Sequence, residues 1–336
     1  MSASSNGLIA CALFALASAF DGSAKSERAA AGPLIVDRGP TRSALHFPRD
    51  EELVYDVSID LGVLGAPSVG SVVLNARVLP FARGVAGEGE PQLEQAIVSA
   101  RARGEYQVYT LDETITTRYR PVGFPRILHE SIQRGTENRH RELSIGTRDG
   151  QALSSYRSDG HCRGCKDEAH YVAPLFFWNE RQHCSGCKSA EHRVWRDAKE
   201  KTLPAGTLDM VSAVILARTV VAQGEDRAAF TLLDRDKLWE VEITRGKRET
   251  RTVSAGRFEL VEVVLSTRPP EGEKEREEDF QGLFGLHGNI SIWMHQDSGV
   301  PVEIAGTLPA GILELDVRIQ LERFSGTPPS FSALEK

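Results

Sequence analysis

Alternating apolar and polar residues constrain this chain more than any other feature of its sequence. In residues 313–322, five aliphatic side chains alternate with polar or charged neighbours: Leu313, Leu315, Val317, Ile319 and Leu321. Successive side chains of a β-strand point to opposite faces of the sheet, so this pattern predicts a strand with one buried and one solvated face. Residues 53–61 and 69–78 show the same period. Strands with one solvated face are typical of antiparallel sheets.

Six further segments carry a strand pattern, at residues 106–116, 141–145, 228–233, 238–244, 258–266 and 289–295. The last of them is separated from an apolar run at Val302 by the residues Gln296, Asp297, Ser298 and Gly299. These residue types supply the backbone angles and local hydrogen bonds of a tight turn, so a hairpin is expected there.

One helix is expected among the strands, over residues 208–223. Thr207 or Asp209 can cap its N-terminus, and Gly224 can end it in a left-handed conformation. Capping accounts for Asp209 and Ser212 without a catalytic role. The apolar positions form a stripe broad enough to pack on a sheet, so the helix is expected to cover one face.

Several separated pieces of the chain resemble the bacterial domain-of-unknown-function 3108 family. They are FPRDEELVYDV at residues 47–57, LDMVSA at 208–213 with Arg218, GRF at 256–258, and ISIWMHQD at 290–297 before VPVEI at 300–304. Their order and spacing carry the resemblance, which implies a curved antiparallel sheet in an exported protein of unassigned activity. With the strand pattern, it predicts a mainly β fold: a half-barrel or sandwich-like sheet with one covering helix and a small cysteine-rich insertion.

The N-terminus has the pattern of an export signal. Residues 7–20 are apolar apart from Ser18, and the residues around it are small, as signal cleavage requires. The run is shorter than the about 20 apolar residues of a membrane-spanning helix, and no later segment approaches that length. We expect a signal peptide over residues 1–19, with cleavage as late as 24, and no transmembrane span in the mature chain. The residues from Leu8 to Cys11 also resemble a lipobox, the signal for lipid attachment to Cys11. Two further interpretations of the same segment are a misassigned start of the chain and an anchor that is retained in the membrane.

The predictions for the remaining segments depend on their amino-acid composition. Residues 20–45 are rich in Ala, Gly, Ser and Pro and hold too few large apolar side chains to offset the entropy lost on ordering, so they are predicted to be a flexible tether. The β domain is expected over residues 46–325, interrupted by a cysteine- and histidine-rich insertion at 158–200. Residues 326–336 are predicted to form a tail.

The strongest local signal is a repeated cysteine motif. The order His-Cys-x-Gly-Cys-Lys, with a second histidine at a fixed offset, occurs at His161, Cys162, Gly164, Cys165, Lys166 and His170 and again at His183, Cys184, Gly186, Cys187, Lys188 and His192. The two Cys-x-x-Cys pairs enclose eighteen residues, a spacing typical of zinc sites. Four thiolates can hold one zinc ion in a closed tetrahedron. We therefore predict Cys162, Cys165, Cys184 and Cys187 as ligands of a structural zinc.

Different chemistries of this segment stay open. The histidines could replace two of the thiolates or help to form two mononuclear sites. Export into an oxidising compartment favours disulfides, within each pair or between the pairs. A redox-active pair is a further possibility, although the expected strand-to-helix context is missing. Covalent haem attachment needs a histidine directly after the second cysteine, where this chain has Lys166 and Lys188.

Composition and motifs limit the classes of function that this chain can have. A net charge of -7 and the absence of a basic stripe argue against nucleic-acid binding. The sequence holds no Gly-x-Ser-x-Gly, His-Glu-x-x-His or phosphate-binding glycine motif, so no catalytic residues are predicted. We expect a non-catalytic exported protein, periplasmic or outer-membrane associated, that binds a hydrophobic ligand or an envelope protein through its curved sheet. Two competing hypotheses are a metal- or thiol-dependent redox enzyme at the cysteine and histidine cluster, and a structural or adhesion protein with a disulfide-stapled insertion.

Overall fold

A computed structural model describes residues 48–62, 65–80, 94–106, 109–119, 127–135, 138–161, 193–272, 280, 287–310 and 313–334. All of them belong to one compact unit, Val36–Lys336. The strands are β1 (Glu51–Asp60), β2 (Ser68–Pro80), β3 (Glu94–Tyr106), β4 (Tyr109–Tyr119), β5 (Ile127–Gly135), β6 (Arg139–Arg148), β7 (Gln151–His161), β8 (Arg193–Trp195), β9 (Lys199–Leu203), β10 (Arg227–Asp234), β11 (Lys237–Val253), β12 (Gly256–Arg268), β13 (His287–His295), β14 (Pro301–Ala310) and β15 (Leu313–Ser325).

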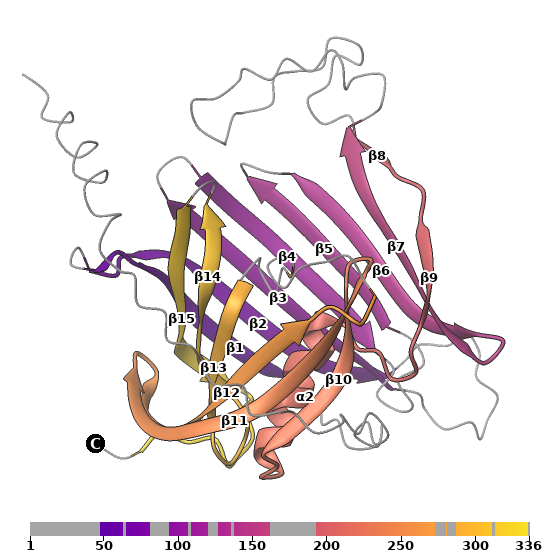
Figure 1. Ribbon diagram of the computed structural model, residues 1–336. Coiled ribbons are helices and arrows are strands. Elements are labelled where there is room, and N and C mark those ends of the chain that lie inside the picture. Colours follow the sequence, from indigo (N-terminus) through magenta and orange to yellow (C-terminus); the bar gives the residue numbers. More distant parts are fainter. Residues whose placement is uncertain are drawn as a thin grey trace, which may run out of the picture. The chain divides into compact units, whose positions relative to one another are not determined.

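These strands form one curved antiparallel sheet (Figure 1). The order is β10-β11-β12-β13-β14-β15-β1-β2-β3-β4-β5-β6-β7-β8, and β9 also pairs with β7. Because β15 pairs with β1, the first and last strands meet in the middle of the sheet. In the described part of the chain the outer strands β8 and β10 are not paired with each other, so the sheet is open rather than a closed barrel. The predicted mainly β, curved antiparallel fold is confirmed.

The strongest predicted strand is confirmed as β15. Its aliphatic residues Val317, Ile319 and Leu321 are buried, and the alternating Arg318 and Glu322 are exposed. The predicted hairpin joins β13 to β14, where Gly299 has a φ of 66°. A Cβ at Gly299 would lie 2.2 Å from the carbonyl oxygen of Arg218, so the turn needs glycine for both space and backbone angle.

Three of the longer strands were not predicted from the sequence: β3, β5 and β7. Strand β3 turns Ala96, Ala100 and Ala102 towards the core, and alanine carries little strand propensity. The buried positions of β5 include Ser131 and Gln133, so an apolar alternation is not visible there. The predicted strand at 106–116 is displaced, because β3 extends to Tyr106 and the following strand begins at Tyr109. Pairing with neighbouring strands overrides these weak local patterns.

Helix α2 (Met210–Ala222) is the only helix in the described ranges and is shorter than the predicted span of 208–223. Of the two expected caps, Asp209 is the N-cap, and its side chain accepts a hydrogen bond from the backbone N–H of Ser212. Gly224 follows the helix with a φ of 74°, as a left-handed end requires. Most of the helix is buried, so it lies within the core rather than on its surface. No helix among the described residues has the length and apolar character needed to cross a membrane.

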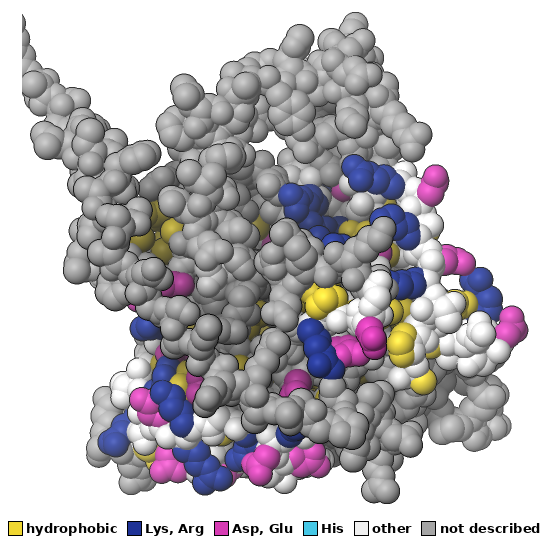
Figure 2. Space-filling model, viewed as in Figure 1, with side chains coloured by type: hydrophobic (Ala, Val, Ile, Leu, Met, Phe, Trp, Pro, Cys, Tyr) yellow, Lys and Arg dark blue, Asp and Glu magenta, His cyan; other side chains and the backbone are white. Residues whose placement is uncertain are grey.

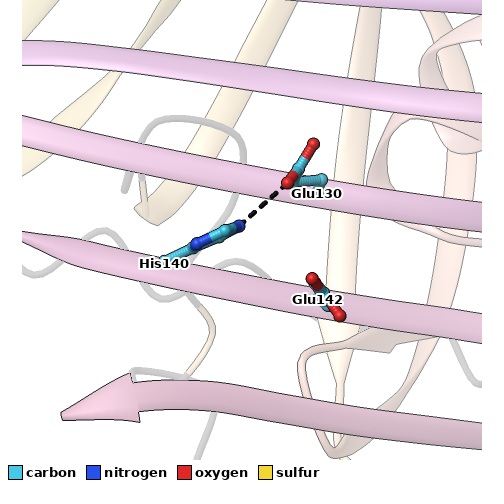
Figure 3. Close-up of side chains that lie close together, drawn as sticks. All are labelled: Glu130, His140 and Glu142. Atoms are coloured by element: carbon cyan, nitrogen blue, oxygen red, sulfur yellow. Dashed lines mark hydrogen bonds and ion pairs between the residues drawn. The ribbon is translucent and has the colours of Figure 1, made fainter. Parts of the chain in front are cut away.

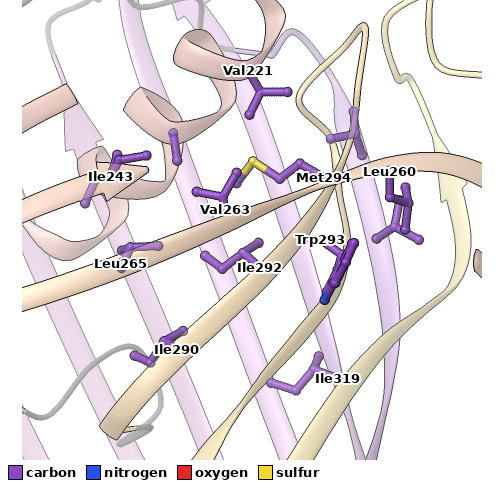
Figure 4. Close-up of a cluster of buried hydrophobic side chains, with 14 of the residues drawn as sticks. Val221, Ile243, Leu260, Val263, Leu265, Ile290, Ile292, Trp293, Met294 and Ile319 are labelled. Atoms are coloured by element: carbon purple, nitrogen blue, oxygen red, sulfur yellow. The ribbon is translucent and has the colours of Figure 1, made fainter. Parts of the chain in front are cut away.

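Two apolar clusters meet at α2. The larger lies mainly on β10–β15 and β1 (Figure 4) and includes the fully buried Ile243, Val263 and Met294. The smaller lies on β2–β7 and includes Ile127, Leu143 and Ile145. Val221 of α2 belongs to the larger cluster and Val211 to the smaller one. The helix therefore joins both halves of the sheet on one face.

A buried ion pair fastens α2 to β1. Arg218 Nη1 donates to Glu51 Oε2 at 2.6 Å, and Nη2 donates to Oε1 at 2.9 Å. The side chains are 8% and 0% exposed. Beside them, the hydroxyl of Tyr55 donates to the carbonyl oxygen of Pro301 at 3.0 Å. Burial raises the pKa of Tyr55 far above its usual value, so this hydroxyl stays protonated.

Candidate functional site

The predicted zinc ligands lie outside the described residues. Cys162, Cys165, Cys184 and Cys187 fall in residues 162–192, as do His170, His183 and His192, and the predicted signal peptide and tether are also outside. His161 is the last residue of β7 and pairs with Arg193 of β8. The two ends of the cysteine segment therefore leave the sheet from neighbouring strands (Figure 1). Residues 158–161 and 193–200 of the predicted insertion belong to or flank these sheet strands.

The strands that carry this segment present a surface that we call the outer face: the face of β4–β8 opposite to the one that contacts α2. Register places its side chains in two rows across the strands. The first row is Arg118, Leu128, Ser144 and Ser155, and the second includes Glu130, Glu142 and Arg157. Together with His129 and Leu143, these residues line an open pocket of about 270 Å³.

A carboxylate–histidine cluster lies at the edge of this pocket (Figure 3). It consists of Glu130 on β5 and of His140 and Glu142 on β6; His140 points towards Glu130, and Glu142 lies nearby. His140 Nε2 lies 2.9 Å from Glu130 Oε1. One potential metal-ligand atom of each side chain lies within 4.8 Å of the other two. Glu130 and Glu142 are direct cross-strand partners, so two like charges oppose each other on adjacent strands.

Arg157 and Trp195 complete this surface. Arg157 donates from Nε to Glu142 Oε2 at 2.7 Å, and its Nη2 lies 2.5 Å from the same oxygen. The guanidinium also lies 4.4 Å from the ring centre of Trp195, a cation–π distance. The Trp195 ring is 4.6 Å from that of His140. Trp195 is the last residue of β8 and is 38% exposed, so the strand that follows the cysteine segment places an accessible indole beside the cluster.

The opposite face of the same strands holds a buried polar network around Asp209. His129 Nδ1 lies 3.4 Å from Asp209 Oδ2 and 2.9 Å from Thr117 Oγ1. Ser212 donates to Asp209 Oδ1 from both its backbone N–H and its hydroxyl, and Tyr119 donates to the same oxygen at 3.4 Å. The Ser212 hydroxyl therefore donates to the same carboxylate that caps the helix. The arrangement is a helix cap fixed to the sheet, as the sequence predicted for Asp209 and Ser212.

Burial and hydrogen bonding act in opposite directions on Asp209. Burial alone would raise the pKa of this carboxyl group, but hydrogen bonding and charge from His129, with the hydrogen bonds of Ser212, hold the pKa below its usual range. Asp209 is therefore ionised at neutral pH inside the core. In the β13–β14 turn, burial lowers the pKa of His295, which is hydrogen-bonded to Ser298.

Charges of both signs are interspersed on the face seen in Figure 2, where Lys and Arg side chains alternate with Asp and Glu. The absence of nucleic-acid binding remains a prediction from composition.

Sequence reasoning missed the outer-face cluster because β5 was not predicted and β6 was predicted too short. A hairpin assignment for residues 127–148 would have placed Glu130 opposite Glu142 and near His140. No short motif encodes this cluster, since its members come from two strands.

The fold defines a β-rich protein with one open antiparallel sheet. No family model and no curated protein matches the chain, so the resemblance to the domain-of-unknown-function 3108 family stays a prediction. Among solved structures, the chain is similar to a β-barrel-like protein of domain of unknown function DUF1849 from Brucella abortus, with 11% identity, a TM-score of 0.48 and coverage of 83% of this chain and 98% of that chain. It is also similar to a protein from Bacteroides fragilis described as exported with a YmcC-like fold, with 10% identity, a TM-score of 0.30 and coverage of 84% and 99%.

A third similar structure is a protein from Parabacteroides distasonis described as a lipoprotein, with 12% identity, a TM-score of 0.26 and coverage of 83% and 97%. At these identities and scores the likeness concerns the general arrangement of strands and carries no functional argument.

Proposed function

We propose that this chain is a non-catalytic, exported protein of the cell envelope that binds a protein partner through the outer face of β4–β8. Export, to the periplasm or to an outer-membrane-associated position, is supported by the apolar N-terminal run and its small-residue cleavage pattern. The β fold supplies the rigid platform on which the binding residues are held.

The observation that carries partner binding is the composition of the outer face. Leu128 and Trp195 are 38% exposed each, and they lie on the same face as the pocket and the paired charges of Glu142 and Arg157. Exposed Trp and Arg side chains are enriched at the energetic centres of protein interfaces. An accessible indole and an exposed apolar side chain on the same face as this polar pocket are therefore suited to a protein interface.

A protein partner is favoured over the hydrophobic ligand that the sequence also suggested. The apolar pocket between α2 and the sheet, lined by residues such as Leu74, Val98 and Val211, has a volume of about 20 Å³. Pockets that bind small molecules have volumes of about 300–1,000 Å³, so this space among the described residues is too small for a lipid or another hydrophobic carrier ligand.

A structural zinc ion bound by Cys162, Cys165, Cys184 and Cys187 is part of the same proposal. Its support is the repeated Cys-x-x-Cys spacing, together with the pairing of His161 and Arg193, which brings both ends of the segment to neighbouring strands. Metal analysis and thiol titration of the exported protein test this part: stoichiometric zinc with thiols that appear after chelation supports it, and metal-free disulfides contradict it.

Site-specific photo-cross-linking tests the binding face. A photoreactive phenylalanine analogue replaces Leu128 in the exported protein, and the control places it at Leu79, an apolar residue of β2 that is 43% exposed. The proposal predicts a discrete adduct of defined mass from Leu128 and none from Leu79. Equal labelling from both positions would contradict a specific binding site at Leu128.

A further inference from the structure

The carboxylate–histidine cluster of Glu130, His140 and Glu142 combines the atoms that first-row divalent cations prefer. An imidazole nitrogen and two carboxylates form a ligand set of the kind used by Zn²⁺ and Mn²⁺ sites, whereas Mg²⁺ and Ca²⁺ favour oxygen alone. The side chains are 34%, 24% and 35% exposed. An ion can therefore reach the cluster from solvent, and its remaining waters can occupy the adjoining pocket.

The charge of the cluster also favours a cation. Glu130 and Glu142 oppose each other in register, a cross-strand arrangement that destabilises a sheet unless positive charge offsets it. Arg157 offsets one of the two carboxylates. Both of its contacts fall on Glu142 Oε2, so Oε1 of Glu142 is not engaged by that guanidinium.

We propose that Glu130, His140 and Glu142 form a binding site for a first-row divalent transition cation. This function goes beyond partner binding and is independent of the zinc proposed for the cysteines. The cation takes the place of the hydrogen bond between His140 Nε2 and Glu130 Oε1.

The distances suit this exchange. Two ligand atoms that bind one ion at about 2.0–2.2 Å lie about 2.9 Å apart at a right angle and about 3.4 Å apart at the tetrahedral angle. His140 Nε2 and Glu130 Oε1 are already 2.9 Å apart. The three ligand atoms all lie within 4.8 Å of one another, so small side-chain shifts must draw them together around the ion.

The surroundings hold His140 in position. Its backbone N–H donates to Asp159 Oδ1 at 2.7 Å, and Trp195 lies 4.6 Å from its ring. Such supporting contacts orient metal ligands before binding. Three protein ligands leave at least one coordination position open, which faces the pocket and is available to water or to an oxygen ligand of a partner.

Mn²⁺ titration of the exported, full-length mature protein tests the site, with free Mn²⁺ followed by electron paramagnetic resonance. Mn²⁺ binds poorly to thiolates, so the cysteine segment does not obscure the result. We expect one Mn²⁺ per chain that is lost, or weakened by at least about tenfold, in Glu130→Gln and in His140→Ala. A matched control is Glu240→Gln, an exposed carboxylate paired with Arg268 on β11 and β12, which should leave binding unchanged.

Fluorescence locates the ion. Bound Mn²⁺ is paramagnetic and should quench the emission of Trp195, and this quenching should be absent from a Trp195→Phe variant. Absence of Mn²⁺ binding at submillimolar concentration, or equal affinity in wild type and Glu130→Gln, would overturn the proposal. Because glutamine has nearly the shape of glutamate, the Glu130→Gln result stands even where His140→Ala changes the fold.

Discussion

His129 Nδ1 lies 3.4 Å from Asp209 Oδ2, and the two side chains are 17% and 1% exposed. This contact joins the centre of β5 to the first turn of α2. The helix is thus held to the sheet at both ends: by the contact of His129 with Asp209 at its start, and by the ion pair of Glu51 and Arg218 nearer its end.

The first prediction concerns Asp209. Its folded-state pKa is depressed, so its contribution to stability is present above the unfolded pKa of about 3.9 and is lost as pH falls through the folded value. His129→Gln should raise the pKa of Asp209 and lower the free energy of unfolding near pH 7 by about 1–3 kcal/mol. Urea unfolding between pH 2 and 7 measures both effects.

The control for this prediction is His140→Gln, which changes a histidine on the outer face of the neighbouring strand. Its stability should stay within about 0.5 kcal/mol of wild type, as is usual for surface substitutions. An equal loss in both variants would mean that the His129–Asp209 contact is not the cause.

The second prediction concerns the buried pair of Arg218 and Glu51. Arg218→Met leaves the Glu51 carboxylate buried without its cation and should destabilise the fold by about 3–5 kcal/mol. Adding Glu51→Gln to Arg218→Met should recover part of that loss, because the buried charge is then removed. Arg268→Met, which breaks the exposed pair with Glu240, should cost at most about 1 kcal/mol. Denaturant unfolding of all variants measures these losses. An equal loss in free energy of unfolding for Arg218→Met and Arg268→Met would contradict the prediction.

The third prediction follows from His295. Burial lowers its pKa in the folded protein, so the unfolded chain binds the proton more readily. Stability should therefore fall as pH drops below about 6.5, the unfolded value, towards the folded pKa. His295→Phe keeps an aromatic ring beside Phe258 and Phe331 and should flatten this part of the pH dependence. If His295→Phe leaves the dependence of stability on pH unchanged, another titrating group causes that dependence.

The fourth prediction separates backbone strain from steric overlap. Gly299 and Gly62 have φ values of 66° and 62°, but a Cβ at Gly62 would have no atom of the described residues within 4 Å. Gly62→Ala should cost about 1–2 kcal/mol for its left-handed conformation. Gly299→Ala carries the same conformational cost, and its Cβ would also overlap with the Arg218 carbonyl oxygen. It should therefore lower the melting temperature clearly more than Gly62→Ala does. Equal melting temperatures would contradict the close approach of the β13–β14 turn to α2.

Much of the fold was predictable where local pattern and tertiary packing agree. The alternation that ends at Leu321 and the turn at Gly299 are local signals, and both predicted features are present. Asp209 was predictable as a cap because a short carboxylate before an apolar run is itself a local signal. Its contact with His129 was not, because the two residues come close only when β5 and α2 are packed together.

The candidate site was less accessible to sequence reasoning. Glu130, His140 and Glu142 are ordinary solvated residues until the β5–β6 register brings them together. The alanines of β3 and the serine and glutamine of β5 hid those strands, since their burial comes from neighbouring strands rather than from their own hydrophobicity. The prediction for the four cysteines depends on spacing alone and remains a prediction.

The most direct test of partner binding is the cross-linking yield from Leu128, measured in wild-type background and with Trp195→Ala. The account predicts an adduct from Leu128 that falls at least about tenfold when Trp195 is removed, as expected for an interface hot spot. It also predicts no adduct from Leu79. Equal yields from Leu128 and Leu79, or a Leu128 adduct that is unaffected by Trp195→Ala, would contradict a binding site on the outer face.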